Sequence, residues 1–395
     1  MSSVNPVLPR LSIAEKERRY SLVRNEMIKR GLDCLIIPQN TGEWDACQAD
    51  ARYLSTIGGG GTAVGIVFPV EGEPIAIVRE PRRIEFWVTA QDWVKDIRAT
   101  KEGRWGAALV EATRSIGMEN ARIGVPGLSG VLRFPDGTVS SGEYEMLKTE
   151  FPNAAFVSAT AFMHEIRMKK SREEIELIKK AQECADAISS AIFEHASEGI
   201  NEQVLYAEMI AAHVRAGGEM PGMFLVGIGQ APNQTFLMPS NRELKINDIL
   251  ICEAEIKYAG YMAQSVESLC LGSPPKEYER LYQLSLECFK HILELAEPGM
   301  PYAELIRFWV KFMEDNNAIA APTMGHGVGL GMDGPTTRPG GDGQGRVIED
   351  GHCFILKPWA ASNVSDYAIR TGNTVVMEKG SLRRLGSLPM EFRKL

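Results

Sequence analysis

The sequence predicts an α/β protein with two domains, and three observations support this. Its 395 residues are too many for one ordinary hydrophobic core. Short apolar strands alternate with helices in the first part of the chain, which is typical of an α/β unit. In the second part, a pair of helices followed by strands occurs twice. We therefore expect an α/β domain over residues 1–165 and a pseudo-symmetric α+β domain over residues 166–395.

The first domain opens with a helix over residues 12–30, in which apolar residues recur at helical spacing between charged ones. Gly31 ends this helix, and the apolar run that follows at residues 32–38 indicates a short buried strand. Two later apolar runs are separated by Glu71-Gly72-Glu73, which is typical of a hairpin turn. The remaining expected elements are strands at 62–70, 74–78 and 121–126 and helices at 107–116 and 141–150.

A long amphipathic helix begins the second domain. Ser171 is a good N-cap for it, and Glu174 three residues later completes a capping box. The further expected elements are a helix at 203–217, a β-rich stretch at 223–271, helices at 277–296 and 302–316, and strands and loops from residue 322 onward.

Composition and charge exclude several classes of function. The net charge is −8 and no long block of Lys or Arg occurs, so we expect neither nucleic acid nor an anionic membrane as a partner. No stretch of about 18 apolar residues is present, which argues against a membrane span. The N-terminus lacks a signal-peptide pattern, and the seven cysteines form no CxxC pair. These features predict a cytoplasmic protein with free thiols.

The first of three segments suited to chemistry is the expected strand at residues 247–255. Strand alternation places Glu253 and Glu255 on the same face, between apolar neighbours. Two carboxylates side by side in such surroundings are costly unless they are paired, protonated or bound to a ligand. The competing interpretation is a strand that faces solvent.

A histidine framed by glycines marks the second segment, residues 323–335. The glycines on both sides of His326 remove side-chain bulk and allow a backbone or a ligand to approach closely. A lone histidine is more often structural than catalytic, but this framing favours a functional role. Asp333, in the same segment, is a candidate for substrate binding.

The third segment, residues 349–359, ends an apolar strand with Lys357 directly before Pro358. We expect this lysine to lie inward or at the edge of a cleft, where burial or a neighbouring carboxylate would tune its charge. The alternative, of equal weight, is a surface lysine whose aliphatic stem lies along apolar residues.

In order and spacing, the three segments resemble the pita-bread family that includes creatinase, Xaa-Pro peptidases and methionine aminopeptidases, peptidase family M24. The Gly-His-Gly-Val-Gly motif at 325–329 and the Tyr-x-Gly-Tyr turn at 258–261 carry this resemblance in combination. Residues 12–78 resemble the creatinase-type N-terminal domain, and the junction at 167–175 resembles the start of the catalytic domain. The resemblance implies a creatinase-like α/β domain followed by a pita-bread catalytic domain.

Metal-dependent members of this family hold two divalent ions with two aspartates, one histidine and two glutamates. Carried over position by position, these ligands fall, in chain order, on Glu253, Gln264, His326, Lys357 and Gly372. Only the histidine is kept. Two divalent cations beside an ammonium group are electrostatically unfavourable, so we expect a site without metal and without another cofactor.

The leading hypothesis is a metal-independent, creatinase-like hydrolase or lyase acting on a small polar molecule that contains nitrogen or a carboxylate. Glu253 or Glu255 would be the general base, since mutual repulsion should raise one pKa toward neutrality. His326 would be the acid or an orienting group, and Lys357 would pair with the carboxylates or hold a substrate carboxylate or a developing oxyanion. The residues assigned to substrate binding are Gln264, Asp333, Tyr261 and Arg370.

Several alternatives remain beside this hypothesis. Creatinase itself acts without metal, but its catalytic histidine precedes the Asn247-Asp248 turn, and residues 230–242 contain none here, which argues against creatine as the substrate. The Glu253-x-Glu255 pair resembles an Asp-x-Asp of the dimethylsulfoniopropionate lyase branch, which supports a lyase. One metal ion held with the help of His352 is another option. The other functions considered are a metal-dependent Xaa-Pro aminopeptidase-like hydrolase and a non-catalytic pita-bread binding protein. The resemblance also implies a homodimer.

Overall fold

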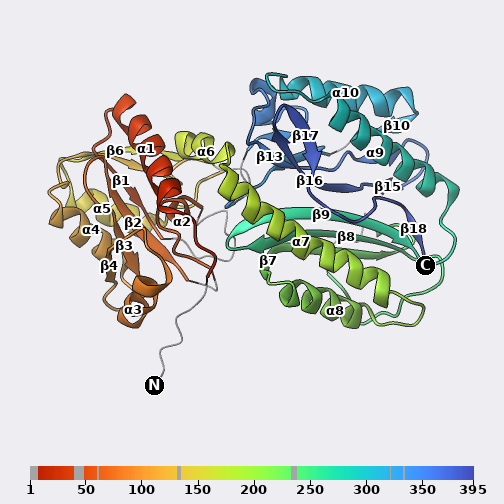
Figure 1. Cartoon of the computed structure of the whole chain (residues 1–395), viewed down its shortest axis with the longest axis horizontal. Coiled ribbons are helices and arrows are strands. Elements are labelled where there is room, and N and C mark those ends of the chain that lie inside the picture. The colour runs from red at the N-terminus through yellow and green to blue at the C-terminus, as the bar shows by residue number, and fades with distance from the viewer. Residues whose placement is uncertain are drawn as a thin grey trace. The chain divides into compact units, whose positions relative to one another are not determined.

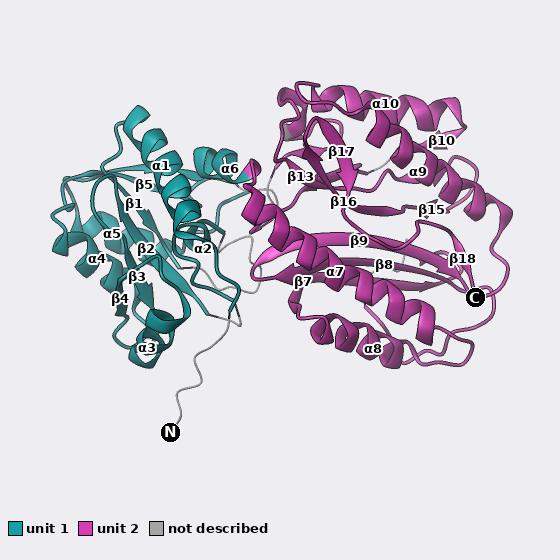
Figure 2. Cartoon of the chain, in the orientation of Figure 1, with its two compact units in different colours: residues 1–167 teal, residues 168–395 magenta. Residues whose placement is uncertain are grey.

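The structure is a computed structural model that describes residues 8–39, 49–59, 62–130, 135–232, 238–320, 322–331 and 334–395. Two compact units divide the chain, Met1–Arg167 and Met168–Leu395 (Figure 2). The division falls after Arg167, where the sequence indicated residue 165. Within the described ranges, no helix is both long and apolar enough to cross a lipid bilayer.

The first unit is built on one mixed sheet with the strand order β4-β3-β2-β1-β5-β6 (Figure 1). The pairs β1–β2 and β2–β3 are antiparallel, whereas β3–β4, β1–β5 and β5–β6 are parallel. The strands are β1 (Cys34–Ile37), β2 (Val64–Pro69), β3 (Ile75–Val78), β4 (Asp96–Ala99), β5 (Arg122–Val125) and β6 (Ala155–Ser158). The helices are α1 (Ile13–Lys29), α2 (Ala49–Ser55), α3 (Pro81–Ala90), α4 (Trp105–Ser115), α5 (Ser141–Glu150) and α6 (Thr160–Met168).

Helices pack on both faces of this sheet. On one face, α4 and α5 contribute Leu109 and Leu147 to a core that also contains Ile36 of β1. On the other face, Tyr20 of α1 packs edge-on against Phe68 of β2, with 5.0 Å between the ring centres. Burial of apolar side chains on both faces is what an α/β layer requires.

The second unit has one large sheet and two helix pairs. The sheet order is β12-β11-β13-β16-β9-β8-β7, and β17 and β18 pair with β16 and β9 respectively. A smaller sheet joins β10, β14 and β15. The helices are α7 (Arg172–His195), α8 (Glu202–Arg215), α9 (Lys276–Leu295) and α10 (Tyr302–Asp315). The strands are β7 (Glu219–Gly229), β8 (Ile249–Tyr258), β9 (Tyr261–Cys270), β10 (Ala318–Ile319), β11 (Gly325–Gly327), β12 (Thr336–Thr337), β13 (Cys353–Leu356), β14 (Ala360–Ser362), β15 (Ala368–Ile369), β16 (Gly372–Glu378), β17 (Ser381–Arg384) and β18 (Arg393–Lys394).

The two helix pairs lie on opposite sides of the strands (Figure 1). Along β8, Cys252 and Ala254 belong to the core beneath α7 and α8, whereas Ile249 and Ile251 belong to the core beneath α9 and α10. Since successive strand residues face opposite sides, Glu253 continues the row of Ile249 and Ile251. The predicted capping box is present at the start of α7.

A tight hairpin sets the register of β8 against β9. Tyr258 pairs with Tyr261, and the two residues between them, Ala259 and Gly260, have φ of 51° and 82°. Two positive φ values in a two-residue loop match the twist of antiparallel strands. This register places Glu255 directly opposite Gln264.

Candidate functional site

Strand alternation and the hairpin register bring three predicted residues to one place on β8 and β9. Glu253, Glu255 and Gln264 are 4%, 1% and 0% exposed. The alternative of a strand facing solvent is therefore wrong. Burial on this scale obliges each polar group to find a partner, because water cannot reach it.

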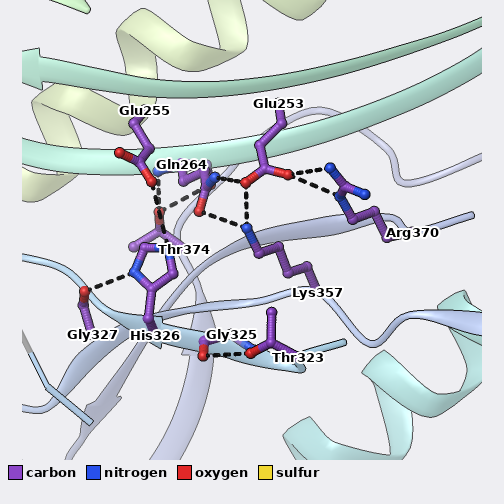
Figure 3. Close-up of polar contacts among 10 residues, drawn as sticks. All are labelled: Glu253, Glu255, Gln264, Thr323, Gly325, His326, Gly327, Lys357, Arg370 and Thr374. Atoms are coloured by element: carbon purple, nitrogen blue, oxygen red, sulfur yellow. Dashed lines mark hydrogen bonds and ion pairs between the residues drawn. The ribbon is translucent and has the colours of Figure 1, made fainter. Parts of the chain in front are cut away.

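The carboxylate of Glu253 is bound from both sides (Figure 3). Its Oε2 atom accepts hydrogen bonds from Arg370, at 2.9 Å from Nε and 2.5 Å from Nη2. Its Oε1 atom accepts one from Gln264 Nε2 at 2.6 Å and another from Lys357 Nζ. Lys357 also reaches Gln264 Oε1 at 3.4 Å. The site thus holds an ion triad of Glu253, Lys357 and Arg370.

This triad decides the charge state of Glu253. Burial would raise the pKa of Glu253, but the attraction of Lys357 and Arg370 outweighs burial and holds that pKa well below its usual range. Burial lowers the pKa of Lys357, and the adjacent Glu253 carboxylate opposes that shift. A carboxylate that binds protons so weakly is a poor general base at neutral pH. Of the two glutamates proposed as the base, Glu255 is the better candidate.

Lys357 lies inside the protein, and the alternative of a surface lysine is wrong. It follows β13 directly and is 4% exposed. Its backbone N–H donates to the carbonyl of Met324 at 2.8 Å, which fixes it beside the strand that carries His326. Arg370, which directly follows β15, places its guanidinium 4.0 Å from the ring centre of Trp359.

His326 lies in the middle of β11 and faces Glu255. Its Nδ1–H donates to the carbonyl of Gly327 at 3.0 Å, so Nε2 carries the lone pair of the neutral ring. Nε2 lies 3.5 Å from Oε1 of Glu255 and has no hydrogen-bond partner in the described part of the chain. The neighbouring Gly325 allows β11 to lie close to β13. A Cβ at Gly325 would lie 2.9 Å from the carbonyl carbon of Ile355. The Nε2 atom is thus available to a proton or a ligand.

Other predicted residues lie elsewhere. Tyr261 points to α7, where its hydroxyl donates to Glu174 Oε1 at 3.2 Å. Asp333 lies outside the described residues. The ring of His352 pairs through Nδ1 with the hydroxyl of Tyr302 at 3.1 Å, and burial followed by repulsion from Lys170 lowers the pKa of His352 to about 4. His352 therefore belongs to a local packing arrangement away from Glu253 and His326.

One residue of the site carried no signal in the sequence. Thr374 of β16 accepts a hydrogen bond from the backbone N–H of Gln264 at 2.8 Å and donates one to the Gln264 carbonyl at 3.1 Å. These two hydrogen bonds join β9 to β16 at the position where the Gln264 side chain contacts Glu253 (Figure 3). A threonine 110 positions from its partner has no local pattern that marks this role.

The positions expected to bind metal do not fit a pair of divalent ions. The carboxylate of Glu253 is already neutralised by Lys357 at Oε1 and by Arg370 at Oε2. At Gly372, any Cβ would lie 2.8 Å from the Cα of Lys357, so no side chain has room there. In the residues that the structure describes, no cluster of three or more His, Cys, Asp or Glu is arranged to hold a metal ion.

Comparison with known proteins identifies the family. The model of the Creatinase/Prolidase N-terminal domain matches residues 19–169, and the model of metallopeptidase family M24 matches residues 176–379, more than half of the chain. The chain belongs to metallopeptidase family M24. The resemblance carried by the Gly-His-Gly-Val-Gly motif and the Tyr-x-Gly-Tyr turn is thereby confirmed.

The curated relatives of this M24 chain include Xaa-Pro dipeptidases. That of Pyrococcus furiosus is 26% identical over 198 residues, covering 49% of this chain and 57% of the relative. That of Lactobacillus helveticus is 24% identical over 226 residues, covering 56% of this chain and 61% of the relative. The chain thus spans less than two thirds of the length of these relatives.

Solved structures agree on the fold. An Xaa-Pro dipeptidase from Bacillus anthracis superposes with a TM-score of 0.80 at 16% identity, covering 96% of this chain and 100% of the other. A prolidase from Thermococcus sibiricus also gives 0.80, at 18% identity and 98% and 100% coverage. The predicted fold, a creatinase-type N-terminal domain followed by a pita-bread domain, is confirmed.

The comparisons correct the predicted function. The leading hypothesis of a metal-independent, creatinase-like hydrolase or lyase for a small polar molecule is wrong, because the matched relatives are Xaa-Pro dipeptidases within a metallopeptidase family. They favour the alternative of a metal-dependent Xaa-Pro aminopeptidase-like hydrolase. The error arose because substituted ligand positions were used to infer a substrate, although residues at such positions serve the reaction at the scissile bond and do not select the side chains around it.

Proposed function

We propose that the chain hydrolyses the peptide C–N bond that precedes proline in short peptides. The observation that carries the proposal is the pairing of His326 with Glu255 inside an M24 fold whose matched relatives are named Xaa-Pro dipeptidases. Both side chains are at least nine-tenths buried.

Hydrolysis of such a bond requires two proton movements. A water molecule must lose a proton as its oxygen attacks the carbonyl carbon, and the proline nitrogen must gain one as the C–N bond breaks. Glu255 is the candidate acceptor. Lys357 and Arg370 stabilise the ionised form of Glu253 and thereby make Glu253 a weak base. His326 Nε2, 3.5 Å from Glu255, is placed to pass the proton on. Lys357 supplies positive charge beside the developing oxyanion.

The test is release of proline from Xaa-Pro dipeptides by the purified chain, measured as purified, after chelation, and with added Mn²⁺ or Co²⁺. We expect release in at least one condition, with Xaa-Ala dipeptides and creatine untouched. His326→Ala and Glu255→Gln should each lower kcat/KM by about 100-fold or more, as loss of a general acid or base does. His291→Ala, on the exposed side of α9, is the matched control and should retain full activity. Absence of proline release in all three conditions would overturn the proposal.

The proposal includes a homodimer in a reducing compartment. Creatinase-like proteins, which this chain resembles, are usually homodimers, and light scattering on the purified chain tests this directly. The six described cysteines are all buried free thiols, which agrees with a cytoplasmic location. A monomer at micromolar concentration would contradict the proposed homodimer.

A further inference from the structure

A connected set of hydrogen bonds lies on the reverse side of β9 and β16, away from Glu253 and His326. It begins at Ser387, near the C-terminus, whose backbone N–H and hydroxyl each donate to Asp186 Oδ2 at 2.7 Å. Asp186 lies on α7, and its Oδ1 atom accepts from Gln182 Nε2 at 2.9 Å. The same amide of Gln182 donates to Ser265 Oγ of β9 at 2.7 Å. Ser387 is thereby connected to β9 through two side chains of one helix.

A second branch reaches β16. The backbone N–H of Gly386 donates to Asn373 Oδ1 at 2.7 Å, and Asn373 Nδ2 donates to Ser265 Oγ at 3.2 Å. The backbone N–H of Leu385 donates to the carbonyl of Thr374 at 2.9 Å. Both branches therefore meet at Ser265, and both begin in the C-terminal turn, residues 385–387.

Ser265, where the two branches meet, is adjacent in sequence to Gln264 of the site. Ser265 and Asn373 are register partners in the β9–β16 pair, and their next neighbours along the strands are Gln264 and Thr374. Successive side chains of a strand face opposite sides of the sheet. Gln264 and Thr374 therefore face the site, where they bond each other and Gln264 holds Glu253 (Figure 3).

We infer that Asp186 is a positioning residue, which fixes β9 through Gln182 and Ser265 so that Gln264 holds Glu253 and Lys357 in place. This inference rests on the proposed function for its kinetic readout. Gln182 and Ser265 are 1% and 4% exposed, so their hydrogen bonds have no water to replace them. An ionised carboxylate only accepts, and Asp186 receives three donors, two from Ser387 and one from Gln182.

The chemistry of Asp186 makes the test selective. In Asp186→Asn the side chain keeps its size, but its amide presents two N–H groups to neighbours that are themselves donors. With one acceptor oxygen in place of two, residue 186 must lose its acceptor toward either Gln182 or Ser387. We expect kcat on the Xaa-Pro dipeptide to fall about tenfold with KM within about twofold, because small displacements of reacting groups slow the chemical step.

A second readout is independent of turnover. With ¹⁵N-glutamine labelling, the side-chain amide signal of Gln264, assigned by its absence in Gln264→Glu, should shift in Asp186→Asn. If wild-type protein releases no proline, the proposed function fails, while this signal still decides the inference. Ser387→Ala, at an exposed position, removes one donor to Asp186 and should move the same signal in a folded protein even if Asp186→Asn does not fold.

The matched control is Glu183→Gln on the same helix, since Glu183 is exposed and pairs with the neighbouring Lys180 at 2.7 Å. Its kcat and its Gln264 signal should equal those of the wild type. The inference is overturned if Asp186→Asn or Ser387→Ala lowers thermal stability yet leaves both the Gln264 signal and kcat unchanged.

Discussion

Lys357 donates a hydrogen bond to Oε1 of Glu253, and both side chains are buried in the second unit. A buried charge is tolerated only when an opposite charge and hydrogen bonds replace its water. Lys357 therefore depends on Glu253, and Glu253 depends on Lys357 and Arg370 together. This mutual dependence gives the site a fixed charge arrangement before any substrate binds.

Removal of Lys357 should expose that dependence. We expect Lys357→Met, which preserves volume, to lower the free energy of unfolding by about 3 kcal/mol, since it leaves part of a buried ion pair uncompensated. The double variant Glu253→Gln with Lys357→Met should cost less than the sum of the two single changes. Urea denaturation followed by circular dichroism measures all three.

The control for Lys357 is an exposed lysine in an ion pair of similar length. Lys311 bonds Asp315 at 2.8 Å on the surface of α10, and Lys311→Met should leave the urea midpoint unchanged because solvent screens such pairs. Additive costs for the double variant at Glu253 and Lys357 would show that the pair is not coupled.

Much of the fold follows from local patterns in the sequence. The capping box at Ser171 and the apolar periodicity after Ser12 predict α7 and α1, and both helices begin one residue after their caps. The helices that local patterns do not predict, α2, α3 and α6, have 7, 10 and 9 residues. Short helices offer few turns over which a period can be recognised, although length alone does not decide, since α5 also has 10 residues and is predicted.

In the site too, local rules predict some features, and contacts between distant residues determine the others. Strand alternation is a local rule and correctly groups Glu253 with Glu255, whereas it cannot show that Arg370, 117 positions away, binds the first of them. The expected rise in the pKa of one glutamate does not hold for Glu253, because two cations brought by distant strands reverse the effect of burial. The same local rule places Tyr261 on the other face of β9 from Gln264, and its hydroxyl bonds Glu174.

Glu267 should make the stability of the protein fall as pH rises. It lies on β9, where burial, reinforced by the nearby Asp186, raises its pKa to about 7 despite a bond from Ser189 and the nearby Arg384 and Arg393. The folded state then holds a proton that the unfolded chain releases above its ordinary pKa of 4.5. The stabilising contribution of this proton is complete below pH 4.5 and is lost as pH rises to about 7.

Replacement of Glu267 by Gln should remove that loss. Because one pKa unit corresponds to about 1.4 kcal/mol, we expect the variant to gain on the order of 1–3 kcal/mol over the wild type at pH 8 and little at pH 4.5. Thermal unfolding between these pH values measures the difference. The exposed residue Glu294 provides the control, and an equal gain in Glu294→Gln would rule out burial as the cause.

His352 should act on stability with the opposite sign. Its folded pKa of about 4 lies below the ordinary value of 6.5, so the unfolded chain binds more protons between these two pH values. Stability from the neutral ring is therefore present above pH 6.5 and is lost as pH falls toward 4. His352→Gln should flatten the acid limb of a plot of melting temperature against pH, whereas His195→Gln, at a half-buried position, should not. Unchanged acid limbs in both variants would contradict this account.

Gly372 tests whether the site can be returned to the ligand pattern of metal-dependent relatives. A side chain at this position would meet the backbone of Lys357, with 2.8 Å between the new Cβ and the Cα of Lys357. We expect Gly372→Ala to lower the free energy of unfolding by about 1–3 kcal/mol through overpacking, and Gly372→Glu to lower it further without binding Mn²⁺ in isothermal titration. Gly345→Ala is the control, since no described atom outside its chain neighbours lies within 4 Å of its Cβ position. Tight Mn²⁺ binding by a stable Gly372→Glu protein would mean that β16 and the Lys357 backbone separate easily, and that the site retains space for a metal ion.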